Sequence, residues 1–208
     1  MNGLQGSLLD VADTAALRPL DGHVARTSLA HGAWVDVRRG WLAGGDQLFE
    51  VLRSAVPWAA ERRQMYDAVV DVPRLTCFYT ETDPLPHPLL EQARERLSTY
   101  YEAELGEPFV TAGMCLYRDG HDSVAWHGDR IGRARDVDTI VAIVSVGADR
   151  PLVLRPRGGG PSRRVASGHG DLVVMGGSCQ RTWDHAVLKT SRAVGPRISV
   201  QFRVRGVR

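Results

Sequence analysis

The feature that most constrains the fold is a change in the spacing of apolar residues near Gly106. Beyond this glycine, apolar residues alternate with polar ones or stand in the short runs TAGMCLY, TIVAIVSV, PLVL, DLVVM and RISVQFRV. The turn-forming stretches RDG, GAD and PRGGGP separate them. Short runs of this kind between turns are typical of β-strands. The C-terminal half is therefore predicted to be all β, and closely spaced antiparallel strands favour a sandwich or a barrel.

Two helices are predicted before the strands. The segment DQLFEVLRSAVPW, from Asp46, places its large apolar residues on one helical face, and Pro57 ends it. A second apolar stripe runs from about Pro88 to Leu105 and stops at Gly106. We expect both helices to cover one outer face of the strands, which gives a mainly β fold with flanking helices.

The 208 residues are 43% hydrophobic and 24% charged, enough for one domain with a substantial core. Residues 1–40 show no sustained periodicity. We interpret them as an N-terminal arm, irregular or partly ordered, and place the folded domain at residues 41–208.

Cysteine usage and hydropathy bear on the setting of the protein. Cys77, Cys115 and Cys179 are widely separated and form no CxxC pair, so neither a disulfide framework nor a thiolate zinc site is indicated. No apolar run approaches the roughly 20 residues of a membrane span, and the N-terminus lacks the pattern of a secretory signal. We expect a cytoplasmic monomer that does not contact membranes.

The positive charge is almost all arginine, with Lys189 the only lysine, although the net charge is only +2. Two groups lie in predicted loops: Arg130, Arg133 and Arg135, then Arg155, Arg157, Arg163 and Arg164. Arginines in loops suit contacts with phosphates. A solvated surface in an arginine-biased chain explains any single one of them equally well.

The metal hypothesis starts from His127 and Asp129 in WHGDR, which project from one face if the chain is extended there. His185 follows further predicted strands, and a closed fold would bring it beside them. Two histidines and a carboxylate form a facial triad, which suits non-haem Fe(II) and leaves three positions for a bidentate co-substrate and dioxygen. Zinc accepts the same side chains. An HxD pair alone also arises by chance, as a surface histidine bonded to an aspartate. His121 and His169 lie in turn-like stretches and are interpreted as loop residues.

The last predicted strand, RISVQFRV, alternates so that Arg197, Ser199, Gln201 and Arg203 share one face. Arginines inside a barrel need anionic partners, and a planar guanidinium suits a carboxylate, so a dicarboxylate ligand is indicated. The alternative is an exposed edge strand. In GMCLYRDG, Cys115 and Tyr117 share a face, and Tyr117 is either a hydroxyl donor to that ligand or a core residue.

In this order, the motifs LYRDG, WHGD, HGDLVVMGG, TWDH and RISVQFR resemble the AlkB family of Fe(II)/2-oxoglutarate-dependent dioxygenases. PRLTCFYT resembles the substrate-lid region of that family, so the resemblance covers roughly Trp41 to Arg203. It implies a double-stranded β-helix, the cupin-like jelly roll.

The resemblance also implies roles for single residues. His127, Asp129 and His185 match the iron ligands, and Arg197 matches the arginine that pairs with the distal carboxylate of 2-oxoglutarate. The further co-substrate positions are Cys115, Tyr117, Ser199 and Arg203, of which Cys115 and Ser199 stand where the family usually has asparagine. On the substrate side we expect Ile131, Arg130 and Arg157. Ile131 replaces an acid that helps the family to recognise the base.

Family members use Fe(II), 2-oxoglutarate and dioxygen to oxidise an N-alkyl group on a nucleobase, and the hydroxymethyl product releases an aldehyde and the repaired base. The implied partner is alkylated DNA or RNA, single-stranded or with a flipped base. Two alternatives stay open: a 2-oxoglutarate oxygenase of proteins or small molecules, and a metal-binding jelly roll without catalysis. The intact ligand set and both strand arginines argue against the latter, and the loop arginines favour nucleic acid over a small molecule.

Overall fold

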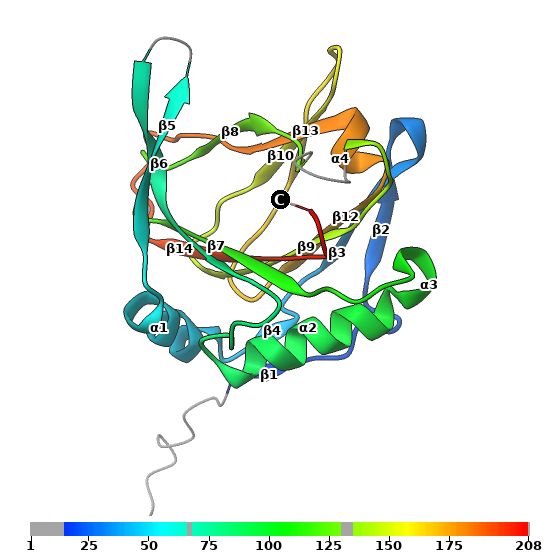
Figure 1. The fold of residues 1–208 in the computed structure, drawn as a ribbon, viewed down its shortest axis with the longest axis horizontal. Helices are drawn as coiled ribbons and strands as arrows, with labels where there is room; N and C mark the ends of the chain where they lie inside the picture. Colours follow the sequence, from blue (N-terminus) through cyan, green and yellow to red (C-terminus); the bar gives the residue numbers. More distant parts are fainter. Residues whose placement is uncertain (1–14, 66–67, 130–134, 208) are drawn as a thin grey trace, which may run out of the picture.

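The computed structural model describes residues 15–65, 68–129 and 135–207, and within them two curved β-sheets face one another (Figure 1). The larger sheet has eight strands in the order β2-β3-β12-β9-β14-β7-β6-β5. Their bounds are β2 Ala25–Ser28, β3 Ala33–Arg38, β12 Leu172–Gly177, β9 Val141–Gly147, β14 Arg197–Arg203, β7 Thr111–Tyr117, β6 Ala68–Tyr79 and β5 Ala59–Met65.

The smaller sheet has four strands in the order β11-β10-β13-β8. They are β11 Arg163–Val165, β10 Leu152–Pro156, β13 Trp183–Val187 and β8 Val124–His127. A separate pair joins β1, Ala16–Leu17, to β4, Leu42–Ala43. All these pairings are antiparallel, which confirms the mainly β fold and agrees with the predicted jelly roll.

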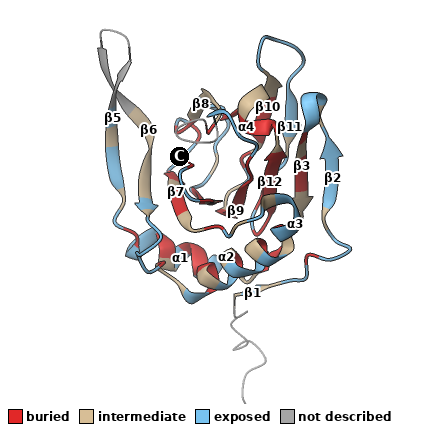
Figure 2. Ribbon diagram, turned by 45° about the vertical axis from the view of Figure 1, so that its right-hand side comes forward, coloured by how far each residue is buried: buried red, intermediate tan, exposed pale blue. Residues whose placement is uncertain are grey.

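The helices lie mainly outside the larger sheet. They are α1 Gly45–Ala55, α2 Pro88–Tyr100, α3 Glu102–Leu105, α4 Cys179–Thr182 and a 3-10 turn, η1 Ala30–Gly32. α1 and α2 both lie below the sheet in Figure 1, and their buried faces turn toward it in Figure 2. Leu52 and Leu97 are fully buried there with Phe202 of β14. Each such side chain contributes about 1.5–3 kcal/mol through burial, so the predicted amphipathic stripes hold both helices on the sheet.

Strand β14 lies in the middle of the larger sheet, between β7 and β9. Its apolar residues pack under the helices, whereas its polar residues line a cavity between the two sheets. The predicted alternation is confirmed, and the exposed-edge alternative is wrong. A second apolar cluster, which includes Ile143, Leu154 and Met175, fills the space between the sheets beside this cavity.

The predicted boundary at residue 40 is incorrect for the part of the arm that the structure describes. Strand β3 pairs with β12 along its whole length, and β2 extends the sheet beyond β3. The segment AWVDVR is short and carries the buried Asp36, so it lacks the uninterrupted alternation that would reveal a strand. Its Ala33 and Val35 nevertheless contribute to the inner apolar cluster. The domain therefore includes residues well before Trp41.

None of the helices formed by the described residues is long and apolar enough to cross a membrane.

Candidate metal and co-substrate site

The two candidate histidines lie opposite one another on neighbouring strands of the smaller sheet. His127 ends β8, and its register partner on β13 is His185. A register shift separates this pair from the pair of Val124 with Val187, so both Val124 and His127 face the cavity. A bulge of this kind re-aims a side chain. The two imidazole rings lie with centroids 4.2 Å apart.

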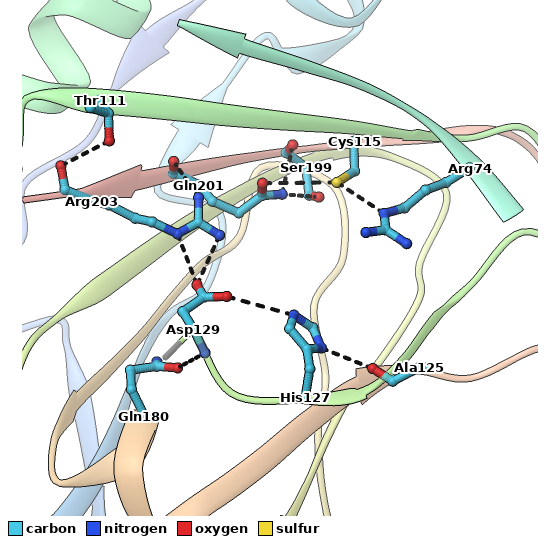
Figure 3. Close-up of polar contacts among 10 residues, drawn as sticks. All are labelled: Arg74, Thr111, Cys115, Ala125, His127, Asp129, Gln180, Ser199, Gln201 and Arg203. Atoms are coloured by element: carbon cyan, nitrogen blue, oxygen red, sulfur yellow. Dashed lines mark hydrogen bonds and ion pairs between the residues drawn. The ribbon is translucent and has the colours of Figure 1, made fainter. Parts of the chain in front are cut away.

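Asp129 completes the group from the residues just after β8. Its Oδ1 lies 3.6 Å from His127 Nε2, and one candidate ligand atom from each of His127, Asp129 and His185 falls within 4.8 Å of the others. The other carboxylate oxygen, Oδ2, accepts a hydrogen bond from Arg203 Nε at 2.8 Å and forms an ion pair with Arg203 Nη2 at 2.8 Å (Figure 3). One edge of the carboxylate is therefore held by an arginine, while the other faces the imidazoles.

The electrostatics keep Asp129 and His185 in forms that bind metal. Burial would raise the pKa of Asp129, but the positive charge of Arg203 and its hydrogen bond to the carboxylate hold this pKa well below its usual value. Burial and the neighbouring His127 lower the pKa of His185 to about 3, so this imidazole is neutral. Ionised carboxylate and neutral imidazole are the ligand forms.

His127 is oriented by its own strand. Its Nδ1 lies 2.8 Å from the carbonyl oxygen of Ala125, which can only accept, so the proton sits on Nδ1 (Figure 3). In the neutral imidazole, the lone pair is then on Nε2, the nitrogen that faces Asp129.

Arg197 is a buried cation with an incomplete set of partners. It is 2% exposed, and its Nη2 donates to Ser145 Oγ at 2.8 Å and to Ser167 Oγ at 3.2 Å. Its Nε and Nη1 have no hydrogen-bond partner among the described residues. Burial lowers the pKa of Arg197. Two donor nitrogens without hydrogen bonds on a buried guanidinium cost free energy unless an anion accepts hydrogen bonds from them. A carboxylate has the matching geometry.

One cavity contains the three candidate ligands and Arg197. The other co-substrate residues expected from the sequence also line it: Cys115, Tyr117, Ser199 and Arg203. Burial raises the pKa of Tyr117 to about 12, so its phenol remains a neutral donor. The arrangement offers metal ligands at one wall and hydrogen-bond donors at the opposite wall.

Two cavity residues were missed by the sequence analysis as site residues. Arg74 of β6 lines the cavity, and its Nε donates to Cys115 Sγ at 3.4 Å (Figure 3). Gln201 lines it as well and accepts from the Cys115 thiol at 3.9 Å. The only sequence signals were the polar face of RISVQFRV for Gln201 and the motif PRLTCFYT for Arg74.

The residues expected to contact substrate are less well placed. Ile131 and Arg130 lie outside the described residues, as does Arg133. Arg157 does not line the cavity: its Nη1 donates to the carbonyl oxygen of Arg181 at 3.2 Å, and its Nε lies 3.8 Å from Asp184. His121 and His169 lie in turns, as expected.

Comparisons with known proteins identify the family to which this chain is similar. The sequence model of the family described as the 2OG-Fe(II) oxygenase superfamily matches residues 45–203. The human protein "Alpha-ketoglutarate-dependent dioxygenase alkB homolog 3" is 31% identical over 203 residues, which cover 86% of this chain and 66% of the human protein. The Bos taurus protein "DNA oxidative demethylase ALKBH2" is 29% identical over 184 residues, covering 77% of this chain and 64% of the bovine protein. The chain thus spans slightly less than two thirds of the length of these relatives.

Solved structures support the fold alone. The structure of OsALKBH1 superposes with a TM-score of 0.57 at 14% identity and covers 86% of this chain and 100% of its own. An oxidoreductase of the 2OG-Fe(II) oxygenase family from Burkholderia pseudomallei superposes with a TM-score of 0.52 at 13% identity, over 76% of each chain.

Proposed function

Because this chain belongs to the 2OG-Fe(II) oxygenase superfamily and, within it, to the AlkB family, we propose that it removes N-linked alkyl groups from nucleobases of DNA or RNA by oxidation. It is an Fe(II)- and 2-oxoglutarate-dependent dioxygenase, and dioxygen is its second co-substrate.

The observation that carries the proposal is the presence of two complementary groups in one cavity. His127, Asp129 and His185 would hold Fe(II), because two imidazoles and one carboxylate leave half of an octahedron open. Arg197, with its two idle donors, would hold the distal carboxylate of 2-oxoglutarate, and the Tyr117 hydroxyl would be a second donor. A dicarboxylate that chelates a metal through its other end satisfies both groups at once.

With Fe(II), 2-oxoglutarate and dioxygen bound, the site would supply the oxidation of the N-alkyl carbon, and the hydroxylated alkyl group would then leave the base as an aldehyde. The residues of the chain bind and orient the reactants. Arg203 holds Oδ2 of Asp129 and so keeps Oδ1 directed toward the histidines. Val141, Ile143 and Leu152 form an apolar part of the cavity wall, which limits the access of water.

Three features support nucleic acid as the substrate. The name of the bovine relative describes a DNA demethylase. A groove beside the smaller sheet is lined by the exposed cations Arg164, Lys189 and Arg192. Next to it, the Arg155 guanidinium lies 4.3 Å from the centre of the Trp126 ring. Cations beside a partly exposed aromatic ring suit a phosphate backbone with accessible bases.

The accepted form of the nucleic acid is proposed to be a single strand or a flipped base. His185 is 6% exposed and Asp129 is 5% exposed, so a base inside a duplex stack would not reach atoms at this depth.

We also propose that the protein acts as a monomer in the cytoplasm, where its three free cysteines would stay reduced.

The test is an activity assay with Fe(II), 2-oxoglutarate and oligonucleotides that carry a single methylated adenine or cytosine. Formaldehyde release and succinate formation are both measured, with His127→Ala as the inactive control. Formaldehyde from the wild type alone supports the proposal. Succinate formation without formaldehyde, and without binding of oligonucleotides at low salt, would transfer the assignment to an oxygenase of proteins or small molecules.

A further inference from the structure

We propose that Gln180 is a positioning residue that fixes the backbone of Asp129 and so sets the geometry of the metal site. This inference rests on the proposed metal triad of His127, Asp129 and His185. It concerns a contact made by the main chain of one ligand, which neither the sequence motifs nor the comparisons assign to any residue.

Gln180 connects the two segments that carry the candidate ligands. It lies on the short helix α4, which leads directly into β13 and His185. Its side chain is almost fully buried at 1% exposure, and its Oε1 accepts a hydrogen bond from the backbone N–H of Asp129 at 3.0 Å (Figure 3). One side chain therefore connects the backbone just after β8 to the helix that precedes β13.

Asp129 needs such a contact because it lies beyond the end of the sheet. Strand β8 stops at His127, so the ladder of backbone hydrogen bonds does not fix the peptide of Asp129. Arg203 holds the carboxylate, and Gln180 holds the main chain at the other end of the same residue. With both ends fixed, the carboxylate keeps its direction toward the imidazoles before any metal arrives.

A purely structural role does not explain why a glutamine stands at position 180. The anchor of α4 is already supplied by Ser178, whose Oγ donates to the carbonyl oxygen of His31 at 2.6 Å, and by Thr182. The Nε2 of Gln180 is buried and has no hydrogen-bond partner among the described residues. An apolar side chain would fill the same space without that desolvation cost. What only the glutamine supplies is the acceptor for Asp129.

The experiment measures metal binding by the apoprotein, without 2-oxoglutarate or substrate. Co(II) replaces Fe(II), because its visible absorption reports ligand geometry and it does not oxidise during the titration. Gln180→Met keeps the volume but removes a strong acceptor, and Gln180→Glu keeps an acceptor oxygen. Gln92→Met, at an exposed position of α2, is the matched control, and thermal unfolding of each apoprotein checks that the variants fold.

We expect Gln180→Met to weaken Co(II) binding by about 10- to 100-fold, as for other residues that orient a metal ligand, and to change the absorption bands. Gln180→Glu should recover most of the affinity, and Gln92→Met should match the wild type. Wild-type affinity and spectrum in Gln180→Met, or equal losses in Gln180→Met and Gln180→Glu, would overturn the role of Gln180. If instead His127→Ala binds Co(II) as the wild type does, the metal triad itself is wrong.

Discussion

Two buried charged side chains, one on each side of the larger sheet, differ in how completely they are hydrogen-bonded. On the helix side, Asp36 is 1% exposed and accepts two hydrogen bonds from Arg26, both at 2.8 Å, and one from the Tyr101 hydroxyl at 2.9 Å. On the cavity side, Arg197 is 2% exposed, yet its Nε and Nη1 have no partner among the described residues.

The difference separates a structural charge from a functional one. The partners of Asp36 come from β2 and α2's C-terminal end, so the carboxylate links the edge of the sheet to the helix layer. The Arg26 guanidinium also lies 3.8 Å from the centre of the Trp34 ring, which packs against Tyr101. The hydrogen bonds of the Asp36 carboxylate are therefore made within the folded protein, without a ligand. Arg197 is complete only when an anion enters the cavity, so its burial lowers the stability of the free protein in exchange for ligand affinity.

The largest effect should come from the metal ligands. His127→Ala or Asp129→Ala should reduce 2-oxoglutarate turnover by more than the roughly 100-fold upper range for outer-sphere changes, because one of three direct ligands is lost. Succinate formation measures this. Since His127 is half-exposed, His127→Ala should leave the free energy of unfolding almost unchanged. Unaltered succinate formation in either variant would remove the metal assignment.

The next effect concerns Arg197 and tests the comparison directly. Arg197→Met should weaken 2-oxoglutarate binding by about 3–5 kcal/mol, roughly 100- to 4,000-fold, because a buried carboxylate loses its charged partner. The free energy of unfolding of the apoprotein should stay the same or rise, since an incompletely paired cation is removed. Calorimetric titration and urea denaturation give the two quantities. A large loss of stability with unchanged affinity would make Arg197 a structural residue.

The opposite result is expected for Asp36. Asp36→Asn should lower the free energy of unfolding by roughly 2–3 kcal/mol, in the range for hydrogen bonds to charged groups. The loss should not exceed this range, because the Arg26 side chain is 41% exposed and can be solvated by water when its partner is removed. Metal and 2-oxoglutarate affinities should not change. Urea denaturation of Asp36→Asn, Arg26→Met and the double variant isolates the coupling of the pair. Additive losses would mean that the two side chains act independently.

The smallest effect is expected at the exposed arginines outside the cavity. The affinity for a methylated single strand should fall as salt rises, and Arg164→Ala should reduce the slope of log affinity against log salt by about 0.7 if this side chain meets one phosphate. Arg53→Ala, on the exposed face of α1, is the control with the same change of charge. Equal slopes in both variants and the wild type would place the nucleic acid elsewhere on the surface.

Local patterns in the sequence were sufficient for the main elements. The apolar stripes of α1 and α2 and the alternation of RISVQFRV each depend on the direction of side chains within one segment, which backbone geometry fixes. The pair His127 and Asp129 could be selected for the same reason, because two residues apart means one face of an extended chain. His185 was added because a closed fold would bring it beside this pair, and the order of the motifs then identified the dicarboxylate as 2-oxoglutarate.

What the sequence by itself determined is therefore the mainly β fold, the helices, the candidate ligands and the polar face of β14. Only the tertiary structure decided which side chain completes which site. The contact of Gln180 with Asp129 joins residues 51 positions apart, and that of Arg203 with Asp129 joins residues 74 apart. The membership of β3 in the sheet likewise depends on β12, far along the chain. The physical reason is that hydrogen bonding and burial depend on distance in space. The sequence of one segment therefore does not reveal which distant residue will contact it once the two sheets have closed.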